Sequence, residues 1–540
     1  MNLFVEIIEK VNSAVWGTPT LMLIIATGIY YTVSLGFFQF SKLPLWLSNT
    51  LFAIFREKET RKKDGEKTAF SQFQAMATSL AATVGTGNIA GVGTAISAGG
   101  PGAVFWMWFC SFFSMMTSYA ENSLGIYFRK RDKNGEWLGG PMYYLKDGLS
   151  KKGGAFLAAA FSFFTLFASF GIGNMTQSNS IAAALSSSFG FSKAAVGIVV
   201  FALSLFVILG GSSRIGALTE KLVPFMALFY IGASFCIIIF NFSQIGNIFS
   251  AIFKSAFSFR AAVGGFSGAA VKKAVSVGFR RGVFSNEAGL GSTVMVGSSS
   301  NIKEPAVQGM WGIFQVFVDT IIICSVTAFV LLSVSVQTVP ISKAMSDAGR
   351  KSCYVSLLPK DDGKKVRLCG EKENRVFGFE NGKILKTDET TFINVIMLKK
   401  SENGAEFEKI EGASLVSLAF YTVFGKWADI ILSLSVTMFA FSTIIGWSFY
   451  GDKSVRFLFK GKGKTIYKIL FSLLTFLGAV TKLDLVWNIS DIFNGLMAIP
   501  NLIGIIFLSK DVFKITENYL SRRKGKVVSP LLNVHDIHDI

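Results

Sequence analysis

Gly85, Gly87 and Ala90 have the G-x-G-x-x-A spacing of a dinucleotide-binding turn. That motif binds a nucleotide only between a strand and a helix, with an acidic residue about 20 positions further on to hold the ribose. Here the motif lies in a stretch without charged residues from 68 to 120, and the residues at that distance, 105–109, are aromatic or apolar. The pattern argues against nucleotide binding, so these glycines need another role.

Glycine occurs together with polar side chains at two places, GTGN at 85–88 and SNEAGLGS at 285–292. Glycine inside a membrane helix weakens it by about 1 kcal/mol relative to alanine, so a cluster indicates either close helix packing or an unwound segment. Unwound backbone at membrane depth supplies N–H groups for a carboxylate and carbonyl oxygens for a cation. This combination fits an amino acid with sodium, because uncharged oxygen ligands suit a monovalent ion.

Long apolar runs dominate the 540-residue chain, in which 51% of the residues are hydrophobic and 16% are charged. Runs of about 20 residues without charge are long enough to cross a bilayer as helices. The N-terminus lacks the basic leader and short apolar core of a cleavable signal, so its first apolar run is expected to stay as a span. The sequence predicts an all-α polytopic membrane protein. The eleven expected helices lie near 15–38, 68–98, 102–128, 154–180, 192–211, 218–241, 268–299, 305–338, 426–450, 465–480 and 484–508.

The formal net charge of +19 is explained by membrane topology. Lysine and arginine gather in alternate loops, as the positive-inside bias requires, and these loops are predicted to be cytoplasmic. The N-terminus is then outside and the C-terminus inside, in a bacterial or archaeal cytoplasmic membrane. Basic residues divided among short loops do not indicate nucleic-acid binding, so the lipid bilayer is the expected partner. The basic clusters are Arg56–Lys63, Arg129–Arg131, Lys151–Lys152, Lys453–Lys464 and Arg522–Lys526.

A polar insertion at 339–412 interrupts the apolar pattern and is predicted to be extracellular. The alternation in VFGFENGKILKT predicts a β-hairpin with Asn381 and Gly382 as its turn. The insertion is either a dispensable cap or a docking surface. Cys353 and Cys369 lie in this polar segment and are the cysteines that could pair, since the other three fall within apolar spans.

Without the insertion, the chain has two halves of matched length with five expected helices each. The second half then enters the membrane from the opposite side, which is the inverted-topology repeat of many secondary transporters. The first helix of each half contains one of the two glycine-rich breaks. The predicted organisation is an extra N-terminal helix in 1–41, a first repeat in 68–241, a second repeat in 268–338 plus 426–508, the insertion in 339–412 and a cytoplasmic tail in 509–540.

Six segments carry a family resemblance: ATVGTGNIAGVGTAI (82–96), PGAVFWMW (101–108), GGPMYYL (139–145), GNMTQSNSIA (173–182), RGVFSNEAGLGS (281–292) and STIIGWSFYG (442–451). Together, and in this order, they resemble the alanine or glycine:cation symporter family. The likeness covers nearly all of the chain except the insertion and the tail. It implies a LeuT-like fold and the import of a small neutral amino acid, alanine or glycine, with sodium. The insertion is a departure from the family.

The resemblance and the breaks together indicate binding residues. The V-G-x-G-N pattern at 84–88 is also similar to neurotransmitter:sodium symporters, and this likeness implies a sodium site built from two carbonyl groups and two hydroxyl groups. The implied sodium ligands are Ala81, Val84, Ser442 and Thr443. The residues expected to hold the substrate are Gly85, Thr86, Gly87, Asn88, Gln177, Ser285, Asn286 and Trp447, of which the first three would receive the carboxylate.

Several of these residues keep two interpretations. Asn88 and Ser285 could hold the substrate or a second cation. Glu287 could brace the unwound loop or contact the ammonium group of the substrate. Asp319, in VFVDTIII, is a candidate functional residue because ionisable groups are rare inside membrane spans, and hydrogen bonding to the broken helix is its alternative.

Asp491 in the last expected span is a candidate outer gate with Arg280 or Arg281. These two arginines make the approach to the helix at 268–299 unexpectedly basic for an extracellular side.

The sequence favours a symporter that works by alternating access, with Na⁺ as its only coupling ion and metal. Two other functions stay open: a proton-coupled amino acid transporter that uses Glu287 or Asp319, and a non-transporting amino acid sensor. An enzyme is not expected, because no nucleophile, base and orienting group recur together. Alanine, glycine, serine and glutamine all stay open as substrates, as does the oligomeric state.

Overall fold

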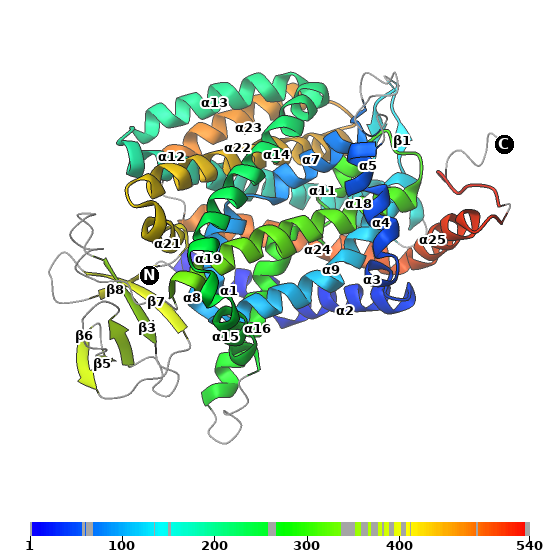
Figure 1. The fold of residues 1–540 in the computed structure, drawn as a ribbon. Helices are drawn as coiled ribbons and strands as arrows, with labels where there is room; N and C mark the ends of the chain where they lie inside the picture. Colours follow the sequence, from blue (N-terminus) through cyan, green and yellow to red (C-terminus); the bar gives the residue numbers. More distant parts are fainter. Residues whose placement is uncertain are drawn as a thin grey trace.

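The computed structural model describes residues 3–56, 60, 69–133, 135–149, 153–257, 266–335, 412–481, 484–526 and 528–534, with six strands between 352 and 410. The described chain is mainly helical, and the strands lie in two small sheets (Figure 1).

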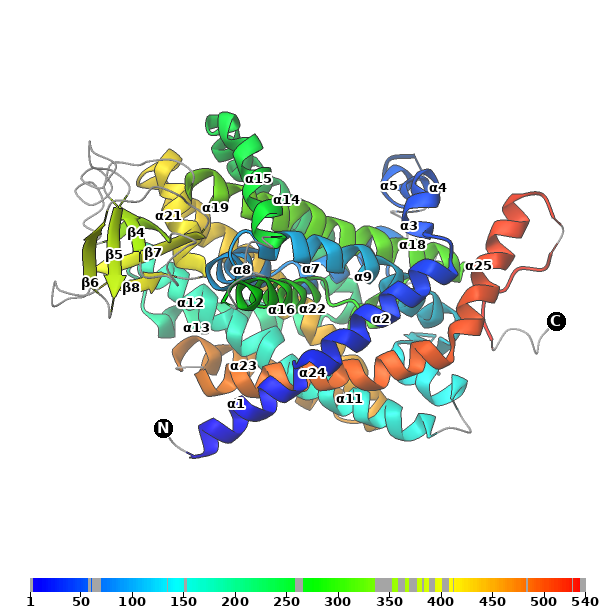
Figure 2. The same cartoon turned by 90° about the horizontal axis from the view of Figure 1, so that it is seen from below.

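Within the described residues, five helices precede the helix that is interrupted at the first glycine-rich break. The helix that the sequence predicts near 15–38 corresponds to the second of them, Thr18–Ser34, and the structure adds a helix before it, Leu3–Val15. Pro19 favours the start of a new helix after Trp16 and Gly17. The first of the five helices lies along α24 and the second along α9 (Figure 2). These elements are α1 (Leu3–Val15), α2 (Thr18–Ser34), α3 (Phe38–Ser41), α4 (Leu43–Asn49) and α5 (Leu51–Arg56).

The first half of the helical body follows. Its first helix is interrupted after Thr83, as the glycine cluster predicts. The elements are α7 (Gln72–Thr83), the π-helical turn η1 (Gly87–Gly91), α8 (Val92–Gly99), α9 (Gly102–Tyr127), α10 (Pro141–Tyr143), η2 (Tyr144–Gly148), α11 (Gly154–Phe170), η3 (Gly171–Met175), α12 (Thr176–Phe189), α13 (Lys193–Leu209) and α14 (Gly211–Phe240).

The second half begins after a short amphipathic helix. Its first long helix ends at Asn286 and the helical path resumes at Val294, which confirms the second predicted break. The elements are η4 (Phe242–Gln244), α15 (Ile245–Ala256), α16 (Phe266–Asn286), α17 (Val294–Gly297), α18 (Pro305–Val316), η6 (Phe317–Cys324), α19 (Ser325–Ser335), α21 (Ala413–Phe424), α22 (Trp427–Leu458), α23 (Lys464–Val480), α24 (Asp484–Phe507) and α25 (Ser509–Arg523).

Membrane-spanning character is clearest in helices that are both long and apolar. Within the described residues, six are long and apolar enough to cross a membrane, and each overlaps one of the eleven expected spans. Two other expected spans are the broken helices, which divide into shorter pieces. The count of eleven and the inverted repeat stay predictions. The six helices are Val5–Ser34, Gly154–Phe189, Gly211–Phe240, Pro305–Ser333, Trp427–Leu458 and Val486–Phe507.

Part of the polar insertion forms an antiparallel sheet with strand order β6-β5-β4-β3-β7-β8. The predicted hairpin is confirmed, because β5 and β6 pair with Glu380 opposite Lys383. Its turn at 381–382 lies outside the described residues, as does Cys369, the proposed partner of Cys353. The strands are β3 (Ser352–Leu357), β4 (Lys365–Leu368), β5 (Val376–Glu380), β6 (Lys383–Thr387), β7 (Asn394–Lys400) and β8 (Phe407–Ile410).

A second, smaller sheet follows α9. Its strands β1 (Lys130–Arg131) and β2 (Trp137–Leu138) pair antiparallel, with Lys130 opposite Leu138. This hairpin lies at the end of the helical body where α22 also ends, and its acidic residues reach the last turns of α22.

Candidate functional site

The first break follows α7, a helix that has a capped N-terminus and ends before Val84. Ser71 caps α7 by accepting a hydrogen bond from the Gln74 amide at 3.1 Å, while the Gln74 side chain accepts one from the Ser71 amide at 3.3 Å. At Val84 the backbone leaves the helical region with ψ at 89°. The chain becomes helical again through a π-helical turn from Gly87, a form that often marks functional positions.

Gly85 lies directly against α22. A Cβ atom at this position would lie 2.7 Å from the Thr443 hydroxyl oxygen, so any larger side chain would displace that hydroxyl. The Gly85 amide donates a 3.0 Å hydrogen bond to the Asn88 side-chain oxygen. Gly85 is therefore required for the close approach of the broken helix to Thr443.

The four expected sodium ligands lie at one contact between α7 and α22. The Ser442 hydroxyl lies 3.3 Å from the Ala81 carbonyl oxygen, and Thr443 faces Gly85, which adjoins Val84. All four are buried. The structure thus brings together uncharged oxygen atoms of the kind that suits a monovalent cation.

Gly446, one helical turn after Ser442, explains why α7 and α22 can pack so closely. A Cβ atom on Gly446 would lie 2.8 Å from the backbone Cα of Ala82.

No group of three or more His, Cys, Asp or Glu side chains able to hold a metal ion occurs in the described residues.

The second break has a backbone that only a few residue types adopt. Glu287, Gly289 and Gly291 all have positive φ angles, of 57°, 90° and 75°. Such angles are unusual for a side chain like glutamate and are accessible to glycine. Gly291 also has no room for a side chain, since a Cβ atom would lie 2.6 Å from Pro141.

A buried hydrogen-bond network joins the two breaks. The Asn88 side-chain amide donates to the Asp319 carboxylate at 2.8 Å and to the Ser285 hydroxyl at 2.9 Å. The Ser285 hydroxyl in turn donates to the other Asp319 oxygen at 2.7 Å. Thr320 adds a third donor to this carboxylate at 2.9 Å. Asp319 therefore binds both breaks, which is one of the two roles that the sequence suggests for it.

Asn286 and Glu287 hold the unwound loop itself. The Asn286 side chain accepts from the Ala288 amide at 3.0 Å and lies 3.2 Å from the Thr320 hydroxyl. Glu287 accepts from Ser292 at 2.5 Å within the same loop. These contacts correspond to the bracing interpretation of Glu287.

Gln177 lies at the first break, whereas Trp447 lies between the π-helical turn η3 and Glu287 of the second break, to which it hydrogen-bonds. Thr86 donates to the Gln177 side-chain oxygen at 3.1 Å. Trp447 packs on the π-helical turn η3, where a Cβ atom on Gly173 would lie 2.2 Å from the indole ring. The structure thus brings Gln177 to the break and Trp447 to the turn that precedes Gln177.

Glu121 is a site residue that the sequence reasoning missed. It is fully buried on α9, accepts a hydrogen bond from Asn501, and interacts with the backbone N–H groups of Gly289 and Gly291 in the second break. Asn501 also donates to the Gly289 carbonyl at 2.9 Å. The signal was an acidic residue within an apolar span, directly after the charge-free stretch that ends at 120.

Asp491 forms an ion pair with Arg280, at 2.8 Å between the Arg280 Nη2 and the Asp491 Oδ2. This contact joins α16 to α24. The Asp491 carboxylate balances the charge of Arg280, one of the basic residues that the sequence places unexpectedly at this helix. The Asp491 backbone carbonyl also accepts from the Trp16 indole at 2.9 Å, so the N-terminal helices pack around the pair.

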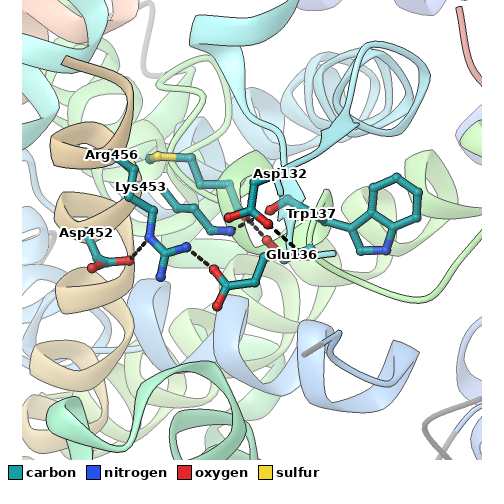
Figure 3. Close-up of polar contacts among 8 residues, drawn as sticks. Asp132, Glu136, Trp137, Asp452, Lys453 and Arg456 are labelled. Atoms are coloured by element: carbon teal, nitrogen blue, oxygen red, sulfur yellow. Dashed lines mark hydrogen bonds and ion pairs between the residues drawn. The ribbon is translucent and has the colours of Figure 1, made fainter. Parts of the chain in front are cut away.

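A second charged cluster ties the β1–β2 hairpin to the end of α22 (Figure 3). Arg456 forms ion pairs with Glu136 of the hairpin and with Asp452 on its own helix, the latter at 2.7 Å. Lys453 donates to the Trp137 carbonyl at 2.7 Å. Burial alone would raise the pKa of Glu136, but the hydrogen bond and positive charge of Arg456 outweigh it and lower this pKa, so the ion pair persists near neutral pH.

Broken helices with a buried polar network between apolar spans are typical of multi-pass membrane transporters. A sequence model of the sodium:alanine symporter family matches residues 1–352 and 387–532. The chain therefore belongs to this family of cation-coupled amino acid symporters. The expectation that the whole insertion at 339–412 departs from the family is wrong, because the family model also matches 339–352 and 387–412 and leaves only 353–386 of the insertion unmatched.

Several relatives are similar over almost their whole length. The sodium/alanine symporter AgcS of Methanococcus maripaludis is 39% identical over 97% of this chain and 99% of its own. An uncharacterised transporter of Haemophilus influenzae is 36% identical over 96% of this chain and 97% of its own. The probable sodium/glutamine symporter GlnT of Bacillus subtilis is 32% identical over 96% of this chain and 91% of its own.

Proposed function

We propose that this protein imports a small neutral amino acid, alanine or glycine, together with sodium by alternating access. The observation that carries the proposal is the contact of α7 with α22, where the Ala81 carbonyl, the Ser442 hydroxyl and the Thr443 hydroxyl converge beside Gly85. Sodium is coordinated there by these oxygens and by the Val84 carbonyl. The names of the relatives AgcS and GlnT support sodium as the coupling ion.

The substrate binds between the two breaks. Its carboxylate is held by backbone N–H groups at Gly85, Thr86 and Gly87, because the end of a half-helix favours negative charge. The Gly85 N–H, which donates to the Asn88 side chain in this structure, exchanges that partner for the carboxylate when the substrate binds. Asn88 and Ser285 bind the substrate or orient the break through Asp319. Gln177 and Trp447 border the pocket on the side of α12 and α22, where the bulk of the indole limits the length of the side chain that fits.

Coupling requires that sodium and substrate each stabilise the same conformation. Sodium joins α7 to α22, and the substrate joins the first break to the second, so both ligands order the segment at 84–88. By thermodynamic linkage, sodium should raise the affinity for the amino acid by the same factor as the amino acid raises the affinity for sodium.

Uptake into liposomes tests the proposal. Purified protein is reconstituted, and labelled alanine is supplied with an inward sodium gradient or with potassium at equal ionic strength and pH. Accumulation above the external concentration with sodium alone is expected. Unlabelled glycine, serine and glutamine, added as competitors, then rank the substrates. Equal accumulation with both cations would contradict sodium coupling.

A proton-coupled mechanism is the second candidate, because the carboxyl groups of Asp319 and Glu287 are both buried at the second break. It predicts uptake that follows an inward proton gradient without sodium, so the same liposomes with an acidic exterior distinguish the two. Binding of alanine without accumulation under any gradient would instead indicate a sensor.

The Arg280–Asp491 pair is expected to act as the outer gate, since it joins the broken helix α16 to α24. Reversing one charge by Arg280→Glu should lower uptake roughly fivefold to tenfold, because an attraction of about 1 kcal/mol becomes a repulsion. The double variant Arg280→Glu/Asp491→Arg should recover part of the loss. The matched control is the exposed pair Lys10–Glu6, whose Lys10→Glu variant should transport normally. Full uptake by Arg280→Glu alone would rule out the gate.

A further inference from the structure

A basic groove lies beside the charged cluster of Figure 3, and the symporter mechanism does not use it. Its walls are the β1–β2 hairpin, η2, the start of α11, and the loop from α22 to α23. The lysines that line it are Lys130, Lys133, Lys146, Lys460, Lys462 and Lys464. Asp132 also lines the groove, so basic side chains far outnumber acidic ones.

Much of this positive charge lacks a counter-charge. Lys130 lies 3.3 Å from Asp147, and Arg456 at the base of the groove pairs with Glu136 and Asp452. In the part of the chain that the structure describes, no carboxylate lies within ion-pair distance of Lys133, Lys460, Lys462 or Lys464. A cluster of uncompensated lysines attracts an anion with several negative oxygen atoms.

The backbone of the α22–α23 loop presents three of these lysines close together. Lys460, Gly461 and Gly463 have positive φ angles of 51°, 84° and 80°, which turn the chain tightly. The Gly461 amide donates to the Arg456 carbonyl at 2.9 Å and fixes the turn. Lys460, Lys462 and Lys464 therefore alternate with glycine on a short, ordered loop.

Large exposed apolar side chains adjoin the lining residues in the sequence: Phe156 follows Ala155, Phe459 precedes Lys460, and Ile466 lies two positions after Lys464. Phe156 at the start of α11 is 76% exposed, Phe459 is 55% exposed and Ile466 on α23 is 73% exposed. Exposed aromatic and aliphatic groups beside lysines are typical of the boundary between the acyl chains and the headgroups of a bilayer. A soluble phosphate would have no use for this apolar border.

From the charge and its apolar border, we infer that the basic groove binds the phosphate headgroup of an anionic phospholipid, with the acyl chains against the exposed apolar side chains. Basic pockets between membrane helices on the cytoplasmic side bind anionic headgroups in this way. The inference shares the proposed topology, in which the loops at 129–131 and 459–464 are cytoplasmic. A bound lipid would link the hairpin that follows α9 to the end of α22.

Native mass spectrometry of the full chain tests the inference, with phosphatidylglycerol or phosphatidylcholine added to the detergent-purified protein. The triple variant Lys460→Gln/Lys462→Gln/Lys464→Gln should bind phosphatidylglycerol at least about tenfold more weakly than the wild type. The matched control removes three exposed lysines elsewhere, by Lys510→Gln/Lys524→Gln/Lys526→Gln, and should stay within about twofold of the wild type. Phosphatidylcholine should bind equally to all three proteins.

Equal loss of phosphatidylglycerol binding in the two triple variants would overturn the inference. The net charge of the protein, and not the groove, would then determine the affinity for this lipid. Competition by glycerol phosphate at the concentration of the lipid would assign the groove to a soluble phosphate instead. If the first variant fails to fold, Lys133→Gln/Lys146→Gln tests the opposite wall. The assay measures no transport, so its result is independent of whether the symport proposal holds.

Discussion

Replacing Asp319 with asparagine is expected to lower sodium-driven alanine uptake by roughly 30-fold to 150-fold, equivalent to about 2–3 kcal/mol. Asp319 accepts hydrogen bonds from Asn88, Ser285 and Thr320, and the first two of these belong to the two breaks. In asparagine an NH₂ group replaces one of the two carboxylate oxygens. At least one of the three donors then loses its acceptor and faces the N–H groups of this amide instead. Initial uptake rates at saturating sodium measure the effect.

Two further variants separate coupling of the breaks from a general loss of stability. Ser285→Ala removes one donor and should have a smaller effect, of about fivefold. The double variant Asp319→Asn/Ser285→Ala should then lose less than the product of the two single losses, because both changes break one network. Asp511→Asn is the matched control on α25, away from the breaks, and should transport normally. Additive losses, or full uptake by Asp319→Asn, would contradict the proposed link between the breaks.

The positions of the two breaks could be predicted from the sequence because their cause is local. Glycine and small polar residues at 85–88 and 285–292 weaken a helix wherever it lies in the fold. The family motifs likewise lie in short continuous segments. The Ser442 hydroxyl lies 3.3 Å from the Ala81 carbonyl oxygen although 361 positions separate the two residues, and their role as sodium ligands stays a prediction.

The bracing of the second break could not be predicted, because it depends on packing between distant helices. Glu121 and Asn501 are 380 positions apart, and neither belongs to a motif that indicates the other. The turn η3 at Gly173 was missed for a related reason. A π-helical turn keeps the apolar composition of the helix around it, and only the Trp447 ring that packs on it reveals why glycine is needed there.

The insertion shows the same division between local and distant causes. The β5–β6 hairpin was predicted from its alternation and its Asn-Gly turn, which are local features. The other strand pairs, such as β3 with both β4 and β7, were not predicted, because their pairing depends on contacts between strands that are distant in the sequence. The first expected helix agrees with α2, and its start after Gly17 follows from Pro19, whereas the additional helix α1 before it was not predicted.

Thr443→Ala is expected to raise the sodium concentration for half-maximal uptake by about tenfold, since the loss of one ligand of about 1.4 kcal/mol has this effect. Thr443 is buried, and its hydroxyl faces Gly85 at the first break, so the change removes an oxygen from the proposed coordination sphere. By linkage, the apparent affinity for alanine should fall at low sodium and recover at high sodium. The sodium activation curve and the alanine dependence at two sodium concentrations measure both effects.

Ser435→Ala provides the matched control on the same helix. Ser435 is also buried, and its hydroxyl donates at 2.8 Å to the Ile431 carbonyl of its own helix, as that of Thr443 does at 2.9 Å to Phe439. Unlike Thr443, Ser435 does not face Gly85. Its sodium activation should match the wild type. Ser442→Ala, which removes the hydroxyl beside the Ala81 carbonyl, should shift sodium activation in the same direction as Thr443→Ala. An unchanged sodium activation curve in a folded, transporting Thr443→Ala variant would show that Thr443 is not a sodium ligand. Sodium would then not be coupled to the first break through the contact of Thr443 with Gly85.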